Sequence, residues 1–342
     1  MKALLFHEHG GPEVLRLEEI DPPRPGPSEV TVQIKACAMN HLDLWTRKGR
    51  PGLQIPMPHI LGSDVSGVVA EVGEGVSSVS PGQEVVVQPG LSCRCCLHCL
   101  QGRDSHCKGY KILGYQVNGG YTERLRVPVE NLLPKPKRLS FEEAASVPLV
   151  FLTAWHMLTE RARLRAGENV LVLAAGSGVG IAAVQIAKLC GARVLATAST
   201  EEKLHMAGEL GADELINYRE KDFASEVKRL TDGRGVDVVI EHVGADTFTK
   251  SLESLARGGR LVTCGATSGP EVKADLRFIF ARHLSILGSF MGGKGELIEL
   301  LPLFDRGKLR PVVDRVYPLE DAPEAHRRME SRELFGKLVL RI

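Results

Sequence analysis

The residues best suited to chemistry by type and spacing are cysteines. Five of the eight cysteines lie in one short stretch, CRCCLHCLQGRDSHC at positions 93–107. The N-terminus turns polar too soon for a secretory signal peptide, so a disulfide framework is not favoured. The stretch therefore predicts a metal site and a reducing, cytoplasmic location, because thiolates are good metal ligands. A redox-active CxxC pair or a metal-free loop is the alternative.

A second candidate site is the small-residue turn AAGSGVG at positions 174–180. An apolar run from Val170 to Leu173 comes before it, and a helix with one apolar face is expected from Ile181 to Leu189. A further β-type run starts at Arg193, so the order is strand, turn, helix, strand. In such a βαβ unit the free N–H groups and the dipole at the helix N-terminus suit a dinucleotide pyrophosphate.

The turn departs from the strict G-x-G-x-x-G pattern of dinucleotide sites. Ala175, Ser177 and Gly180 stand at the three fingerprint spacings, and Gly178 is an additional glycine. A Gly-rich turn that serves packing alone is therefore an alternative. The end of the second β-type run supports the binding site over packing.

That end also indicates which dinucleotide is bound. An NAD site usually carries an acidic residue there, which holds the ribose 2′-hydroxyl. Here the run continues into Ala198-Ser199-Thr200, without an acid at its tip. The hydroxyl of Ser199 and the ammonium of Lys203 suit a 2′-phosphate, which needs donors and positive charge. We therefore expect NADP(H) rather than NAD(H). In the alternative, Ser199 merely caps the next helix and Lys203 is a solvated charge.

The composition describes an ordinary globular protein. Its 342 residues predict two domains, and 43% hydrophobic with 25% charged residues is typical of a folded, water-soluble chain. The net charge of +1 and the lack of a basic stripe give no support to nucleic acid or membrane partners. A small-molecule substrate is the expected partner.

Two kinds of segment follow one another along the chain. The first part alternates apolar and polar residues between Gly/Pro breaks, which indicates a β-rich domain with a strand pair at 62–73. Ser140 with Glu143 matches a helix capping box. After the βαβ unit, strands are expected at 237–241, 259–264 and 284–289, with helices between them. This alternation predicts an α/β fold with a parallel sheet covered by helices on both faces.

Several stretches of the chain resemble one known superfamily. They are LGSDVSGVVAEVG at 61–73, the cysteine lobe, NGGYTERLRV at 118–127, AAGSGVG, and GKLVL at 336–340. Together they resemble the medium-chain dehydrogenases/reductases, which include zinc alcohol dehydrogenases and NADPH quinone oxidoreductases. The resemblance implies a GroES-like catalytic domain at 1–150, completed by 290–342, and a Rossmann domain with a doubly wound parallel sheet at 151–289. It places the active site in the cleft between them.

The resemblance also distinguishes two kinds of zinc site, one structural and one catalytic. Cys93, Cys96, Cys99 and Cys107 have the spacing of the structural zinc lobe of the superfamily, which implies one zinc per chain held in a closed shell of four thiolates. Cys95 is not needed for it. The catalytic zinc ligands of the alcohol dehydrogenases fall on other residues, because the corresponding positions hold Asn40, Ser63-Asp64 and Leu149.

This chain therefore resembles the zinc-free quinone oxidoreductases. Without a Lewis acid, a quinone or an α,β-unsaturated carbonyl is a better hydride acceptor than a saturated alcohol is a donor. We expect an NADPH-dependent reductase of such compounds. The alternative is a zinc-dependent alcohol dehydrogenase with a rearranged site built from His41 or His59 with Asp64. A cofactor-binding protein without turnover is a further possibility.

The resemblance supplies the remaining site predictions. Asn40 is the candidate polar donor in the active site, with Asp43 three residues on as a further catalytic candidate and Tyr121 as a weaker one. In the alternative, the Asn40 amide ties its loop down or contacts the nicotinamide ribose. The expected cofactor contacts are Thr153, Ser177, Gly178, Val179, Gly180, Ser199, Lys203, Tyr218, Val243, Gly244, Gly265, Ser289 and Arg332. The apolar strand at 284–290 could pair with its copy at a sheet edge, which predicts a homodimer or homotetramer.

Overall fold

The computed structural model describes residues 1–49, 52 and 54–342. Two compact units are formed, one from Met1–Leu149 with Gly293–Ile342 and one from Val150–Gly292. We refer to them as unit 1 and unit 2, and each is described by itself. Over the residues described, no helix is both long and apolar enough to cross a membrane.

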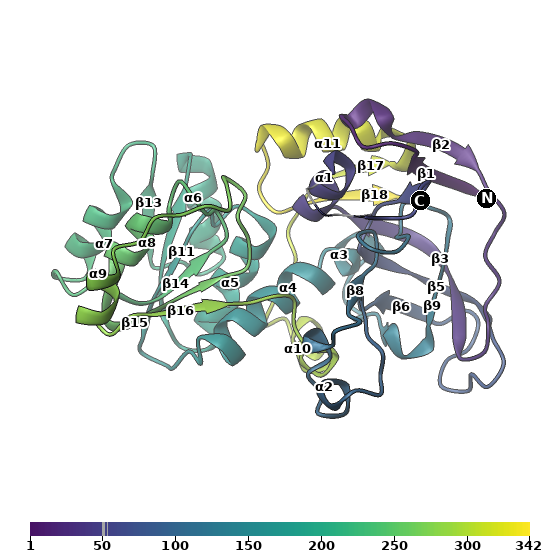
Figure 1. The fold of residues 1–342 in the computed structure, drawn as a ribbon, viewed down its shortest axis with the longest axis horizontal. Coiled ribbons are helices and arrows are strands. Elements are labelled where there is room, and N and C mark those ends of the chain that lie inside the picture. Colours follow the sequence, from purple (N-terminus) through teal and green to yellow (C-terminus); the bar gives the residue numbers. More distant parts are fainter. Residues whose placement is uncertain (50–51, 53) are drawn as a thin grey trace. The chain divides into compact units, whose positions relative to one another are not determined.

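Unit 1 is built on two main sheets in which most neighbouring strands are antiparallel (Figure 1). The smaller sheet has the order β2-β1-β4, and the larger has the order β10-β6-β5-β3-β18-β17 with β9 beside β3. C-terminal strands β17 and β18 thus complete a sheet begun by the N-terminal part of the chain. The strands are β1 (Lys2–Phe6), β2 (Arg16–Glu19), β3 (Glu29–Ala38), β4 (His59–Ile60), β5 (Asp64–Val72), β6 (Glu84–Val87), β9 (Arg124–Pro128), β10 (Leu132–Pro134), β17 (Val313–Pro318) and β18 (Lys337–Arg341).

The prediction of a strand pair at 62–73 is wrong, because this segment contains the single strand β5. Its glycine does not mark a turn. A Cβ on Gly67 would lie 2.2 Å from the carbonyl oxygen of Gln33 in the neighbouring strand β3. The glycine is therefore needed where the two strands approach each other closely.

One helix of unit 1, which starts at Phe141, begins at the predicted cap. Ser140 and Glu143 form the predicted capping box, with the Glu143 N–H donating to Ser140 Oγ at 3.2 Å and the Ser140 N–H donating to Glu143 Oε2 at 2.8 Å. Unit 1 contains helices α1 (His41–Lys48), α2 (Leu97–Leu100), α3 (Phe141–Ala145), α10 (Lys294–Asp305) and α11 (Ala322–Ser331), with the short strands β7 (Gly90–Leu91) and β8 (Lys111–Ile112). Helix α4 (Pro148–Trp155) spans the change from unit 1 to unit 2.

Unit 2 contains a six-stranded sheet with the order β13-β12-β11-β14-β15-β16 (Figure 1). Every neighbouring pair is parallel, as the alternation of strands and helices predicts. The strands are β11 (Asn169–Val172), β12 (Arg193–Ala198), β13 (Glu214–Asn217), β14 (Val236–Glu241), β15 (Leu255–Thr263) and β16 (Ser285–Gly288). The helices are α5 (Gly178–Leu189), α6 (Glu201–Glu209), α7 (Phe223–Leu230), α8 (Phe248–Ser254) and α9 (Leu276–Ala281).

This strand order is that of a doubly wound Rossmann sheet, in which ligands bind outside the carboxyl ends of the strands where the order reverses. Numbered along the chain within unit 2, the order reads 3-2-1-4-5-6, so the reversal lies between β11 and β14. The cofactor site is therefore expected at the carboxyl ends of these two strands.

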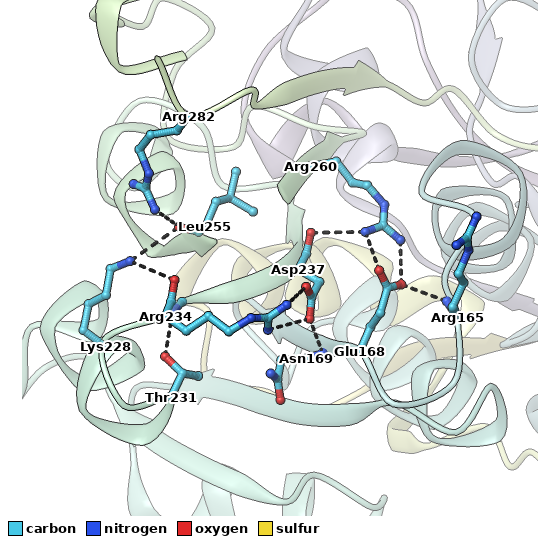
Figure 2. A network of polar contacts seen from close by, with 11 residues as sticks. Arg165, Glu168, Asn169, Lys228, Thr231, Arg234, Asp237, Leu255, Arg260 and Arg282 are labelled. Carbon is cyan, nitrogen blue, oxygen red and sulfur yellow. Dashed lines mark hydrogen bonds and ion pairs between the residues drawn. The ribbon is translucent and has the colours of Figure 1, made fainter. Parts of the chain in front are cut away.

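The opposite, amino ends of the strands are joined by ion pairs (Figure 2). Arg260 donates to both carboxylate oxygens of Glu168, at 2.9 and 2.7 Å. Asp237 pairs with Arg234 and accepts the N–H of Asn169 at 2.9 Å. Glu168 precedes β11, Asp237 lies in β14 and Arg260 lies in β15, so the network connects three adjacent strands at the edge away from the expected cofactor site.

Candidate active site

Three polar side chains converge where three strands of unit 1 meet. Asn40 follows β3, Asp64 begins β5 and Lys337 begins β18. Strand β3 lies between the other two, with Ala38 opposite both Asp64 and Val339. The sheet register therefore brings residues from opposite ends of the chain into one cluster.

The three side chains form a closed set of hydrogen bonds. Lys337 Nζ donates to Asn40 Oδ1 at 2.6 Å and to Asp64 Oδ2 at 3.0 Å, and Asn40 Nδ2 donates to Asp64 Oδ2 at 2.9 Å. The other oxygen of Asp64 accepts the N–H of Leu149 at 2.8 Å. Asp64, Lys337 and Asn40 are exposed by 0%, 2% and 6%, so the ion pair is shielded from water. A buried charge pair of this kind is tolerated only with such additional hydrogen bonds.

Asp43 holds the two loops that carry this cluster. Its carboxylate accepts the N–H of Asn40 at 2.7 Å and the N–H of Gly62 at 3.0 Å. Burial raises the pKa of Asp43 to about 6, although the two N–H donors and Lys337 act in the opposite direction. The position indicates that Asp43 orients Asn40 and the 62–64 turn.

Tyr121 is fully buried behind the same turn. Its ring packs so closely that a Cβ on Gly62 would lie 2.5 Å from Tyr121 Cδ1. Its hydroxyl lies 3.4 Å from Nε2 of His326, whose Nδ1 lies 3.0 Å from Nη1 of Arg47. Because arginine can only donate, His326 Nδ1 accepts and its Nε2–H faces Tyr121. Burial lowers the pKa of His326 to about 3, which is consistent with a neutral ring.

The two histidines of the alternative zinc site do not form a group of potential metal ligands with Asp64 in the described residues. Ser63 donates its hydroxyl to the carbonyl of Leu113 at 2.7 Å. His59 is fully buried with its ring 5.7 Å from that of Phe6, and His41 lies against Trp45 on α1. Within the described part of the chain, the one group of three or more potential metal ligands is the cysteine lobe.

The cysteine lobe has the geometry of a tetrahedral zinc site. The sulfur atoms of Cys93, Cys96, Cys99 and Cys107 all lie within 4.8 Å of one another, with 3.5 Å between Cys96 and Cys99 and 3.9 Å between Cys93 and Cys99. A Zn–S bond of about 2.3 Å in a tetrahedron gives S···S separations of about 3.8 Å. Hydrogen bonds from the N–H groups of Cys95 and Cys96 lower the pKa of Cys93 to about 6, which favours the thiolate ligand. Four protein ligands leave no position open for a substrate.

The turn before α5 is tightly packed and leads directly into the helix N-terminus. Ser177 Oγ caps the helix by accepting the N–H of Gly180 at 3.0 Å. A Cβ on Gly180 would lie 2.4 Å from the carbonyl oxygen of Ala174, so only glycine fits there. The helix begins at Gly178 rather than at Ile181, which leaves the N–H groups of its first residues, Gly178 and Val179, without acceptors inside the helix.

Two residues that the sequence analysis missed hold the turn after β14. Glu241 is fully buried and accepts from the N–H of Val243 at 2.7 Å, the N–H of Gly244 at 3.1 Å and Ser251 Oγ at 2.6 Å. Nε2 of His242 lies 3.0 Å from Ser177 Oγ, which connects the turns after β11 and β14 at the reversal of strand order. The sequence signal that could have indicated Glu241 is its carboxylate at the end of an apolar strand, in DVVIEHVG.

Most predicted cofactor residues follow the carboxyl ends of the parallel strands. Ser177 follows β11, Ser199 follows β12, Tyr218 follows β13, Val243 and Gly244 follow β14, Gly265 follows β15, and Ser289 follows β16. Parallel strands place these ends at one edge of the sheet, so the residues share that edge. Thr153 lies on α4, with Oγ1 at 4.0 Å from Sδ of Met291.

Two of the residues predicted to contact the 2′-phosphate, Ser199 and Arg332, lie in different units. The cap of α6 is Thr200, whose Oγ1 accepts the N–H of Lys203 at 3.3 Å, so the alternative in which Ser199 caps this helix is wrong. Arg332 lies in unit 1, in the left-handed C-cap of α11 with φ +60°. Its role toward the cofactor stays a prediction.

Comparison with known proteins identifies the family. Residues 26–137 match the alcohol dehydrogenase GroES-like domain and residues 178–306 match the zinc-binding dehydrogenase family. A crystal structure of an NAD-dependent alcohol dehydrogenase is 52% identical, with a TM-score of 0.97 over 100% of both chains. An NAD-dependent alcohol dehydrogenase of Sulfolobus acidocaldarius is 33% identical over 100% of both chains. The quinone oxidoreductase of Rattus norvegicus is 32% identical over 99% of this chain and 97% of its own.

The chain therefore belongs to the medium-chain dehydrogenase/reductase superfamily, in the family of zinc-containing alcohol dehydrogenases and quinone oxidoreductases. It is an NAD(P)-dependent oxidoreductase with a GroES-like domain, a Rossmann domain and a structural zinc site of four cysteines. The predicted fold class, enzyme class and superfamily are confirmed.

Proposed function

We propose that the enzyme transfers hydride from NADPH to quinones or to α,β-unsaturated carbonyl compounds. The observation that carries this proposal is the Asn40–Asp64–Lys337 cluster, which stands where the zinc branch has its catalytic ligands. In the reaction, NADPH gives two electrons and one hydrogen to the β-carbon of an enone, or to a quinone. A proton from water completes the saturated carbonyl compound or the quinol, and NADP⁺ leaves.

Asn40 is the group we assign to the substrate oxygen. One hydrogen of its Nδ2 is donated to Asp64, and the amide carries a second. Directed at a carbonyl oxygen, this second hydrogen stabilises the negative charge that develops there as hydride arrives. A fixed donor of this kind contributes about a 10²- to 10³-fold acceleration in comparable sites.

The cofactor is bound, in this proposal, at the carboxyl edge of the unit 2 sheet. The helix N-terminus at Gly178, Val179 and Gly180 receives the pyrophosphate. Ser199, which is not used as a helix cap, receives the 2′-phosphate together with Lys203 and Tyr218. The arrangement favours NADPH because Ala198 ends β12 where an NAD site usually has an acid.

Steady-state kinetics with matched cofactors and acceptors tests the proposal. The purified enzyme is assayed with NADPH and NADH against 1,4-benzoquinone and 2-cyclohexen-1-one, and with NADP⁺ and NAD⁺ against alcohols. We expect a higher kcat/KM for NADPH with the quinone or the enone, and one zinc per chain by elemental analysis. Turnover of alcohols alone would contradict the proposal, and no turnover of any pair would favour a cofactor-binding protein.

A second candidate is an NAD(H)-dependent alcohol dehydrogenase. It is favoured by the names of two similar proteins, the structure at 52% identity and the Sulfolobus acidocaldarius relative. A second zinc per chain that survives replacement of Cys93 and Cys96 by serine would support this candidate. Alcohols and aldehydes with NAD(H) would then be the substrates.

We also propose that the enzyme is a homodimer or a homotetramer. Strand β16 ends the sheet of unit 2, and its Ile286 is 41% exposed. An apolar strand with a free edge can pair with its copy across a two-fold axis. Light scattering of the pure protein tests this, and a monomer at micromolar concentration would contradict it.

A further inference from the structure

Lys337 has a position that the proposed reaction does not yet explain. It is a cation at the start of an otherwise apolar strand, with 2% of its surface exposed. Its ammonium contacts both Asn40 and Asp64, the residues at the positions of two zinc ligands in the related alcohol dehydrogenases. A positive charge is therefore built into the place from which a metal would act.

The ammonium determines which way the Asn40 amide faces. An ammonium only donates and a carboxylate only accepts, so Asn40 Oδ1 must face Lys337 and Nδ2 must face Asp64. The distances of 2.6 and 2.9 Å agree with this orientation. Asn40 consequently cannot present its oxygen to a substrate, and the group it has left to offer is an N–H.

The same contact polarises that N–H. A hydrogen bond to a charged partner is shorter and stronger than a neutral one, and linked hydrogen bonds strengthen one another where water is excluded. With its oxygen bound to the ammonium, the Asn40 amide carries more positive charge on Nδ2 and becomes a better donor. Asp43 holds the main-chain N–H of the same residue at 2.7 Å, so the amide is positioned from both sides.

We propose that Lys337 is a positioning residue for hydride transfer: it orients and polarises the Asn40 amide, in the place where the zinc branch holds its catalytic metal. This inference rests on the proposed function, because it assigns the Asn40 N–H to the substrate oxygen. The proton count is unchanged, since Lys337 keeps its proton and water supplies the one that completes the product.

The test uses variants that keep the buried charges balanced. Lys337→Met alone leaves Asp64 buried without its cation, so Lys337→Met/Asp64→Asn is the principal variant and Lys337→Arg the conservative one. Lys135→Met is the matched control, because Lys135 is also a lysine of unit 1 whose side chain is only 6% exposed and is paired with a carboxylate, that of Glu84 at 3.2 Å. Melting temperature and zinc content establish that each variant is folded.

Hydride transfer is measured in single turnovers with NADPH and with NADPH deuterated at the transferred position. For 2-cyclohexen-1-one we expect the double variant to be slower by about 100-fold, the loss typical of a missing oxyanion donor. For 1,4-benzoquinone, which needs less help to accept hydride, the loss is smaller. The KM for NADPH is unchanged, the isotope effect rises, and Lys337→Arg recovers most of the rate. Equal rates in the double variant and Lys135→Met would overturn the inference.

A second measurement does not depend on turnover. In protein labelled with ¹⁵N-asparagine, the Asn40 side-chain signals are assigned by their loss in Asn40→Asp. We expect slow solvent exchange of these two hydrogens in the wild-type protein and fast exchange in the double variant. If the wild-type enzyme reduces neither acceptor but this exchange depends on Lys337, the proposed function fails and the positioning stands. Exchange that is unchanged by the substitutions would overturn the positioning itself.

Discussion

The raised pKa of Asp43 makes the stability of the enzyme depend on pH in a predictable way. Burial raises the pKa of this carboxyl to about 6 in the folded protein, against about 3.9 in an unfolded chain. The unfolded state therefore loses its proton first as pH rises, and unfolding becomes easier between about pH 4 and pH 6. The difference between the two pKa values corresponds to about 3 kcal/mol. This contribution to stability is fully present below pH 4 and is lost above pH 6.

Replacing Asp43 by Asn removes this titration. The variant also loses one of the two N–H partners, because an amide offers one oxygen to Asn40 and Gly62, and this loss of about 1–3 kcal/mol is independent of pH. We therefore expect the stability advantage of the wild-type protein over Asp43→Asn to shrink by about 3 kcal/mol from pH 4 to pH 7.

Urea unfolding of both proteins at several pH values measures this difference directly. Asp222→Asn serves as a control of opposite sign, because hydrogen bonding to Lys250 and to the Ser225 N–H lowers the pKa of Asp222. The wild-type advantage over that variant should grow as pH rises through the acidic range. A stability difference between wild type and Asp43→Asn that stays constant with pH, or that grows with pH, would refute the reasoning about Asp43.

Three further predictions concern the metal and the cofactor. Replacing Cys93 and Cys96 by serine should reduce zinc from one to none per chain in elemental analysis and lower the melting temperature, because the lobe loses half of its ligands. Gly180→Ala should weaken NADPH binding at least tenfold in calorimetry, since its Cβ would lie 2.4 Å from a main-chain oxygen of the turn. Thr200→Ala should lower stability by about 1 kcal/mol through the lost cap, whereas Ser199→Ala should raise the KM for NADPH but not for NADH.

Local patterns predicted the parts of this structure that local chemistry determines. The cysteine spacing brings four sulfurs within 4.8 Å because the ligands lie in one short lobe. The Ser140 capping box and the Ser177 turn likewise depend on residues a few positions apart. Gly67 shows where such patterns mislead, since a glycine in a strand indicates a break unless the neighbouring strand is known.

The long-range contacts could not be predicted from the sequence. Lys337 and Asp64 are separated by 273 positions and meet only because β18 and β5 flank β3. The contact between Ser177 and His242 similarly requires the strand order of the unit 2 sheet. A lysine that opens an apolar strand, GKLVL, was the one visible signal for the first of these, and it gives no indication of a partner.

The chemistry of the cluster predicts which bond of a test substrate is reduced. An alcohol dehydrogenase binds the substrate oxygen directly to zinc, which stabilises the alkoxide of a simple alcohol. With its oxygen bound to Lys337, Asn40 can offer a substrate only an N–H, and the charge of Lys337 is paired with Asp64 at 3.0 Å. Donors of this kind suit an enolate or a quinol oxygen, which is far less basic than an alkoxide. We therefore expect 2-cyclohexen-1-one to be converted to cyclohexanone, with cyclohexanone itself left unreduced. Gas chromatography of the products checks this, and 2-cyclohexen-1-ol as the main product would show that the site stabilises an alkoxide after all.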